Sequence, residues 1–145
     1  MSLSPDISSG RESAFLRALS GEAVSPPPVW LMRQAGRYLE EYRAVRATQP
    51  DFISFCLNPD AASEVTLQPI RRFGFDAAIL FADILLIPYG LGQKTWFEPG
   101  EGPKLEPLDL ETIDALDVEG SERVLAPVGE TVARVRAELG QETAL

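Results

Sequence analysis

Hydrophobic and polar positions change their spacing several times along the chain, and each change marks an expected element. Apolar residues at helical spacing, Phe15, Leu16 and Leu19, predict a short first helix that ends before Gly21. Ser9 and Glu12 have the spacing of a capping box for this helix. The chain is therefore expected to open with a short amphipathic helix.

The next blocks predict a strand followed by two helices. Three prolines force extended backbone, and the apolar run Val29–Met32 then reads as a short buried strand. Charged and apolar residues return at helical spacing from about Leu39 to Ala47. A longer helix is expected to begin after Asn58, a typical N-cap residue, and to end at Gly74.

The second half begins with an apolar run from Ala77, typical of a parallel strand that is covered on both faces. The stretch from Gly92 to Pro107 is rich in glycine and proline and predicts a long loop or a hairpin. Apolar positions from Val124 to Leu139 predict a last amphipathic helix, interrupted in its first turns by Pro127.

Strands that alternate with helices over short links predict an α/β fold with a parallel sheet, either open or closed into a barrel. The sequence contains neither GxGxxG nor GxxxxGK[ST], the usual phosphate-binding loops of nucleotide-binding sheets. In both architectures, residues that directly follow parallel strands lie at the edge where sites are built. Arg33 follows the first expected strand, and Asp83 follows the second.

Composition narrows the classes of function. The 145 residues are 45% hydrophobic and 24% charged, which suits a single domain with a core. A formal charge of -9 and a pI near 4.5 argue against nucleic acid or an anionic membrane as a partner. The N-terminus lacks a signal-peptide pattern, and no apolar run reaches the roughly 20 residues of a membrane span. A cytoplasmic protein is expected.

The counts of cysteine and histidine argue against a disulfide and against a metal site. Cys56 is the single cysteine, so an internal disulfide is excluded, and we expect it to be a buried small hydrophobe and not a reactive thiol. The chain has no histidine, the commonest metal ligand and general base. No metal site is predicted.

Arg33, Arg37 and Asp83 are the candidate functional residues. The two arginines have two interpretations, a solvated helix face or a binding site for an anionic ligand. Asp83 has only apolar neighbours in sequence, so it either caps a turn, pairs structurally with an arginine, or helps to bind a ligand. Gly36 lies between the arginines, where the lack of a side chain would let a ligand approach the backbone.

Three stretches of the chain resemble one enzyme family. They are RQAGRYLEEYR at 33–43, PDAASEVTLQPIRRFGFDAAILFADILLIP at 59–88 and GEGP at 100–103. Together they are similar to the uroporphyrinogen decarboxylases, from about Pro28 to Pro107. The resemblance implies a lyase without cofactor or metal, which converts the four acetate side chains of uroporphyrinogen to methyl groups and yields coproporphyrinogen in haem and chlorophyll biosynthesis.

The resemblance also implies an architecture and a set of site residues. The expected fold is the N-terminal part of a (β/α)8 TIM-type barrel, and the working enzyme is a homodimer. Asp83 would stabilise the pyrrole cation, and Arg33, or a water that it orients, would handle the proton. The residues expected to bind substrate are Arg33, Gln34, Ala35, Gly36, Arg37, Phe81, Asp83 and Ile84.

The sequence departs from the family pattern at two positions and, more strongly, in its length. Glu40 and Ala82 stand where the family usually has proline and serine, and neither change removes a proposed contact. A complete barrel needs about 250 residues. The chain is therefore interpreted as an N-terminal portion, residues 1–145 of a truncated barrel, that is incomplete and inactive alone.

Two alternatives remain. One is a methyltransferase of the same superfamily, which would need a zinc site of cysteine and histidine. The other is a non-catalytic fragment or binding module that keeps the sequence of an enzyme.

Overall fold

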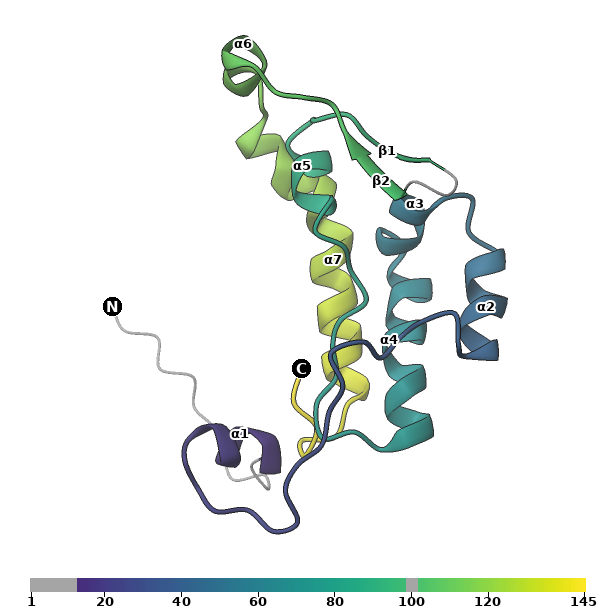
Figure 1. The fold of residues 1–145 in the computed structure, drawn as a ribbon, viewed down its shortest axis with the longest axis vertical. Helices are drawn as coiled ribbons and strands as arrows, with labels where there is room; N and C mark the ends of the chain where they lie inside the picture. Colours follow the sequence, from purple (N-terminus) through teal and green to yellow (C-terminus); the bar gives the residue numbers. More distant parts are fainter. Residues whose placement is uncertain (1–12, 99–101) are drawn as a thin grey trace.

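The computed structural model describes residues 13–98 and 102–145, and helices dominate it (Figure 1). In chain order the elements are α1 (Ala14–Leu19), α2 (Glu40–Ala47), α3 (Phe52–Cys56), α4 (Pro59–Phe73), α5 (Leu86–Gly90), β1 (Thr95–Glu98), β2 (Gly102–Leu105), α6 (Leu110–Asp114) and α7 (Val118–Glu138). The expected capping box of Ser9 and Glu12 lies outside the described residues. None of the helices in the described part is long and apolar enough to cross a membrane.

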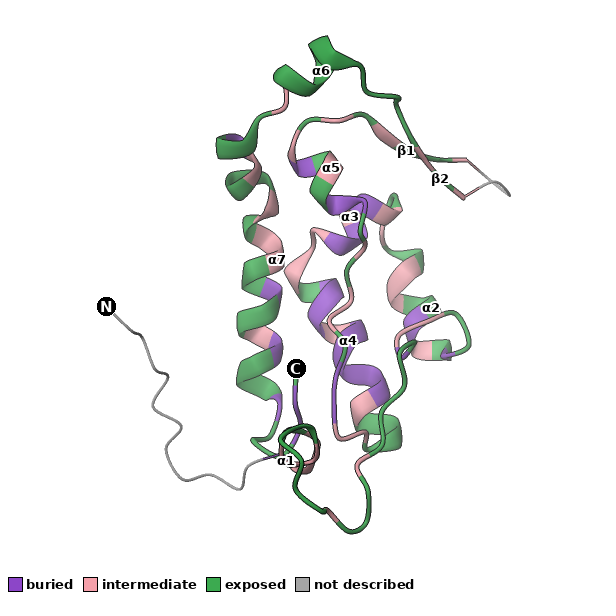
Figure 2. Ribbon diagram, turned by 60° about the vertical axis from the view of Figure 1, so that its left-hand side comes forward, coloured by how far each residue is buried: buried purple, intermediate pink, exposed green. Residues whose placement is uncertain are grey.

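Helix α4 is the centre of the packing, and α2 and α7 lie on either side of it (Figure 2). The side chain of Asn58 accepts hydrogen bonds from the N–H groups of Asp60 and Ala61, so it is the N-cap that the sequence predicts. At the other end Gly74 adopts φ 65°, a left-handed conformation that glycine takes without strain. Val65, which is fully buried, anchors the helix in the core.

Helix α7 covers the other side of α4 and begins at Val118, six residues before the apolar stripe that predicts it. Asp117 caps its first turn by accepting a hydrogen bond from the N–H of Gly120. The helix continues through Pro127, and its buried Val135 packs in a cluster with Leu67 of α4. The expected helix is confirmed, with an earlier start.

Three extended segments meet near the bottom of the molecule, as drawn in Figure 1. The N–H of Asp76 donates to the carbonyl of Val29 at 3.0 Å, and the N–H of Ala144 donates to the carbonyl of Asp76 at 3.0 Å. Ala77 and Ala144 form a parallel bridge, supported by a hydrogen bond of 2.7 Å from the N–H of Ala78 to the carbonyl of Ala144. Segments that follow one another in sequence thus lie side by side, as in a parallel α/β sheet.

The expected strand at Val29–Met32 is wrong in its burial and its regularity. Its side chains are 37–77% exposed, and the segment is extended without being a strand. The run after Ala77 has only the one bridge, so it is not a regular strand either, but its expected burial holds at its start, where Ala77 and Ala78 are 4% and 3% exposed. A strand satisfies its backbone only through neighbouring strands, and among the described residues these segments meet their neighbours only near Asp76.

The glycine- and proline-rich stretch forms an antiparallel hairpin, one of the two outcomes expected for it. Strands β1 and β2 pair from Thr95 opposite Leu105 to Glu98 opposite Gly102. The first two residues of the GEGP motif lie outside the described part, and Gly102 has a positive φ of 87°.

Candidate functional site

The loop that carries both candidate arginines lies just before α2. Arg33 and Arg37 are exposed, and neither guanidinium forms a hydrogen bond or an ion pair with the rest of residues 13–98 and 102–145. Because α2 begins only at Glu40, the interpretation of the arginines as one face of a helix is wrong. Both side chains are available for an anionic partner.

Asp83 lies at the end of the extended segment and is half-buried. Its Oδ1 accepts a hydrogen bond of 2.9 Å from the N–H of Leu85, and its carbonyl accepts one of 3.1 Å from the N–H of Leu86. Asp83 therefore caps the turn into α5, one of its predicted structural roles. Within the described residues no arginine pairs with it, so its second carboxylate oxygen stays open to a ligand.

Arg37 and Asp83 line the same cavity, which has a volume of about 920 Å³. Its walls come from α2, from the start of α3, from the turn at Asp83 and from the β1–β2 hairpin. The lining residues are Arg37, Tyr42, Arg46, Pro50, Asp51, Phe52, Ile53, Asp83, Thr95, Trp96, Phe97, Glu98, Gly102 and Pro103. The structure thus brings together two of the three candidate residues, while Arg33 lies outside this lining.

Aromatic rings form one side of the cavity and connect it to the core. Phe52 contacts both Phe97 of the hairpin, at a centroid distance of 5.1 Å, and Phe81, at 5.8 Å. Phe81 in turn packs on Phe55, which is fully buried, at 4.6 Å. The hairpin wall is therefore joined to the core through edge-to-face and tilted aromatic contacts.

Other charged groups in the cavity already have partners within the chain. Nη1 of Arg46 donates to the carbonyl of Gln49 at 2.9 Å, and Glu98 accepts a hydrogen bond of 3.1 Å from the indole of Trp96. Asp51 caps α3 by accepting hydrogen bonds from the N–H and hydroxyl of Ser54, at 2.8 and 2.6 Å. These bonds lower the pKa of Asp51. Asp83 and Glu98 each accept one such hydrogen bond, so Arg37 is the charged group of this lining whose side chain has no hydrogen bond or ion pair within the described residues.

Sequence reasoning missed Arg46 and the hairpin residues as lining. Arg46 is in the last turn of α2, nine positions after Arg37, so no short spacing links it to the other arginines. Trp96 and Phe97 lie in the stretch from Gly92 to Pro107, for which the sequence predicted only a long loop or a hairpin. The aromatic pair within that stretch was the available signal.

Two further titratable groups near the cavity are held neutral. Burial raises the pKa of Tyr42, although the nearby Arg46 opposes the shift. Burial also raises the pKa of Cys56 to about 12, with a further contribution from the negative charge of Asp83. Cys56 is 1% exposed, so the expectation of a buried thiol is confirmed.

The remaining predicted binding residues occupy different environments. Ile84 is 88% exposed, whereas Ala35 and Phe81 are partly buried against the core cluster around Leu39. A Cβ built on Gly36 would meet only the ring of Tyr38, at 3.4 Å, an ordinary contact. The described chain does not require glycine there, and a role in ligand approach stays a prediction.

Gln34 is buried, and its side chain bonds to the backbone of a distant segment. Its Nε2 donates to the carbonyl of Ala77 at 2.7 Å, and its Oε1 accepts from the N–H of Ile79 at 3.0 Å. Both ends of this amide are therefore used within the chain.

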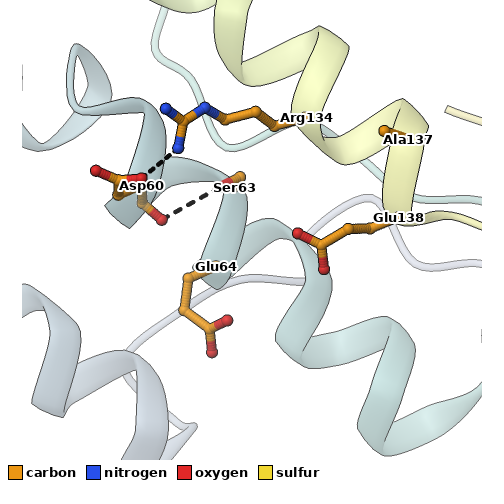
Figure 3. Close-up of a pocket in the computed structure, with 6 residues that line it drawn as sticks. All are labelled: Asp60, Ser63, Glu64, Arg134, Ala137 and Glu138. Atoms are coloured by element: carbon orange, nitrogen blue, oxygen red, sulfur yellow. Dashed lines mark hydrogen bonds and ion pairs between the residues drawn. The ribbon is translucent and has the colours of Figure 1, made fainter.

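A second hollow, of about 400 Å³, lies between α4 and α7 (Figure 3). Arg134 of α7 reaches across it to Asp60 of α4 and also pairs with Glu130. Arg71 pairs with Glu138 at 3.4 Å on the same face. Because opposite charges here are matched with one another, this surface joins two helices and offers no free group for chemistry.

No three side chains of histidine, cysteine, aspartate or glutamate gather as a metal site within the described residues.

Comparison with known proteins gives one family. Residues 11–145 match the family model of uroporphyrinogen decarboxylase (URO-D). The chain is 62% identical over 131 residues to the uroporphyrinogen decarboxylase of Maricaulis maris (strain MCS10), covering 90% of this chain and 38% of the relative. It is 61% identical over 133 residues to the uroporphyrinogen decarboxylase of Caulobacter vibrioides (strain NA1000 / CB15N), and the match covers 90% of this chain and 37% of the relative. It is 60% identical over 135 residues to that of Acidiphilium cryptum (strain JF-5), covering 92% and 38%.

The chain thus spans little more than a third of the length of these curated relatives. The aligned part contains the Arg33–Arg37 loop, α4 and the turn at Asp83.

Proposed function

The chain belongs to the uroporphyrinogen decarboxylase family, and from that premise we propose that it supplies part of the site that converts uroporphyrinogen to coproporphyrinogen. The observation that carries the proposal is the common cavity of Arg37 and Asp83. One residue offers a free cation for substrate carboxylates, and the other offers a free carboxylate oxygen for pyrrole N–H groups. The two alternatives, a methyltransferase and a binding module, are not favoured because the matched relatives are all named decarboxylases.

Substrate binding falls to the arginines. A porphyrinogen with eight carboxylates suits guanidinium groups, which bind carboxylates in bidentate geometry and stay charged at any working pH. Arg37 lines the cavity without an internal partner for its guanidinium, and the exposed Arg33 is four positions away on the same loop. Ala35, Gly36, Phe81 and Ile84 complete the proposed contact set, and Gln34 belongs to it through its backbone alone, because its side chain is bonded to Ala77 and Ile79.

Catalysis falls to Asp83. Protonation of a pyrrole ring carbon makes a cation; the bond between the acetate CH₂ and its carboxylate then breaks, CO₂ leaves and the electron pair moves into the ring. Protonation of the exocyclic carbon gives the methyl group, and loss of the added ring proton restores the pyrrole. The negative charge of Asp83 stabilises the cation, most strongly where water is excluded. Guanidinium groups hold their protons too tightly to be good acids, so Arg33 acts by orienting a water as proton donor.

The same premise gives the wider architecture. Residues 1–145 form the first part of a (β/α)8 barrel; the parallel bridge of Ala77 to Ala144 and the hydrogen bond between Asp76 and Val29 support this arrangement, because they place segments in the order of the chain. The complete enzyme is a cytoplasmic homodimer with no nucleic acid or membrane partner, and it works without a cofactor.

The test uses a full-length protein, here called the exchange chain. It is the Maricaulis maris relative in which the matched segment is replaced by the corresponding residues of this chain, 62% identical to it. Incubated anaerobically with uroporphyrinogen, the exchange chain should form coproporphyrinogen at a rate within about tenfold of the unaltered relative. Chromatography of the porphyrins follows the loss of carboxyl groups. Binding of uroporphyrinogen without any turnover would favour a binding module and contradict the proposal.

A further inference from the structure

The side chain of Gln34 takes the place of a neighbouring strand. It is 2% exposed, and its amide bonds to Ala77 and Ile79, 43 and 45 residues away in sequence. In extended backbone the carbonyl of one residue and the N–H of the residue two positions later point to the same edge. These are the two groups that a residue on a parallel neighbouring strand would bind.

The backbone of the segment that leads to Asp83 has few other hydrogen bonds to the rest of the described chain, although Phe81 packs in the core. Its start forms the single bridge of Ala77 to Ala144, and the N–H of Phe81 donates to the hydroxyl of Thr66 at 2.9 Å. Within the described residues, Gln34 thus supplies the hydrogen bonds between the Arg33–Arg37 loop and the segment that ends at Asp83, while Ala35 and Phe81 pack against the same core cluster.

The loop itself is closed around Gln34. The carbonyl of Gln34 accepts a hydrogen bond from the hydroxyl of Tyr38, and the carbonyl of Gly36 accepts one of 3.0 Å from the N–H of Leu39. A shift of Gln34 therefore carries Arg33 and Arg37 with it. Stabilisation of a developing charge depends on groups held within about 0.5 Å of the productive geometry.

We propose that Gln34 is a positioning residue, whose side chain fixes the arginine loop against the segment that carries Asp83 and does not itself touch the substrate. This inference rests on the proposed function and assigns the Gln34 amide a different task from direct substrate binding. Substitution of Gln34 leaves the carbonyl of Ala77 and the N–H of Ile79 without the partner that they have in this structure.

Gln68 provides a matched control. It is a buried glutamine, 5% exposed, on α4, and its Nε2 donates to Glu64 four residues earlier in the same helix, at 3.0 Å. Gln68→Met therefore makes the same chemical change as Gln34→Met without breaking a link between the loop and the Asp83 segment. Both variants are made in the exchange chain.

The first readout is amide hydrogen exchange, which requires no activity. In Gln34→Met the N–H of Ile79 should exchange about tenfold faster, as expected when one hydrogen bond is lost. In Gln68→Met its exchange should stay within about twofold of the unaltered exchange chain. Where circular dichroism shows Gln34→Met to be unfolded, Gln34→Asn replaces it, because its amide is one methylene shorter and no longer reaches the N–H of Ile79. Unchanged exchange at Ile79 in a folded Gln34 variant overturns the inference.

The second readout is a double-mutant cycle with Asp83→Asn. If Gln34 acts by placing Asp83 relative to the arginines, Gln34→Met alone should lower turnover about tenfold or more. In the Gln34→Met background, Asp83→Asn should then lower turnover by a factor about fivefold or more smaller than it does in the unaltered exchange chain. Additive losses, as expected for Gln68→Met, overturn the positioning role. If the unaltered exchange chain forms no coproporphyrinogen, the proposed function fails, and exchange at Ile79 still decides the link.

Discussion

Helix α4 and the segment from Ala77 to Asp83 are neighbours in sequence but differ in how their backbones are satisfied. In α4 the hydrogen bonds are local, and caps at Asn58 and Gly74 close the ends. In the following segment the amides of Ile79 and Phe81 depend on side chains from other elements. The backbone hydrogen bonds of the helix are satisfied by residues close in sequence, whereas those of the segment are satisfied by side chains of other elements.

The proposed site residues lie where the backbone depends on other elements for its hydrogen bonds. Val29–Met32 and Ile79 keep apolar side chains exposed within the described residues. Asp83 terminates such a segment, and the arginine loop terminates another. Changes at these ends should therefore affect turnover, and changes in α4 should affect stability.

The largest expected effect is that of Asp83→Asn in the exchange chain. Asparagine keeps the volume and the oxygen that caps the turn at Leu85, so the fold should be preserved while the charge is lost. Turnover of uroporphyrinogen should fall by about 100-fold or more. Asp76→Asn is the control, because that carboxylate only accepts a hydrogen bond from the N–H of Val29. A near-normal rate for Asp83→Asn would remove its electrostatic role.

A smaller effect is expected from Arg33→Lys and Arg37→Lys. Each replaces a planar fork with a point charge, so kcat/KM for uroporphyrinogen should fall about tenfold in each variant. Arg123→Lys on the exposed surface of α7 should leave it unchanged. If steady-state kinetics are equal for all three variants, the two arginines are solvent-exposed residues without a substrate role.

Asn58→Ala tests the opposite half of the comparison. Loss of the side chain that caps α4 should lower the free energy of unfolding by about 1 kcal/mol, measured by urea denaturation of the exchange chain. Turnover per folded molecule should not change. Asn58→Asp, which can still accept from the N–H groups of Asp60 and Ala61, should restore most of the stability. A loss of turnover without a loss of stability would break the proposed division between the two regions.

The smallest effect concerns Asp51 and pH. Hydrogen bonds from Ser54 hold the pKa of this carboxyl below its ordinary value. The charged cap therefore adds stability above the unfolded pKa of about 3.9, and this contribution is lost as the pH falls through the lower folded value. The difference in unfolding free energy between the exchange chain and its Asp51→Asn variant, which does not titrate, should shrink between pH 7 and pH 3. A difference that is constant over this range would contradict the assignment.

The sequence predicted locally determined elements well and the extended segments less well. The two ends of α4 were predictable because Asn58 and Gly74 act on their immediate neighbours. The helices α3 and α6 were not predicted because each has five residues, too few for a periodic pattern, although Asp51 and Asp109 cap them. The extended segments were predicted to be buried strands, but burial of a strand depends on neighbours distant in sequence.

The candidate site shows a similar limit. The order of elements singled out Arg33 and Asp83, and Arg37 was a candidate as the second arginine of the same loop; of these, Arg37 and Asp83 line one cavity. The contacts of Gln34 with Ala77 and Ile79 could not be read from sequence, because a glutamine in a short loop has no spacing that reveals a partner 43 residues away.

Whether the site needs residues beyond this chain is tested most directly with the 145-residue chain itself. Its cavity has walls from α2, α3, the Asp83 turn and the hairpin, and the chain spans 38% of the Maricaulis maris relative. A site that does not exclude water stabilises a pyrrole cation poorly. Incubated anaerobically with uroporphyrinogen beside an equal concentration of the exchange chain, the 145-residue chain should form no coproporphyrinogen above the protein-free background. Steady formation of coproporphyrinogen by the chain alone, free of full-length enzyme, would show that these residues suffice and would contradict the account.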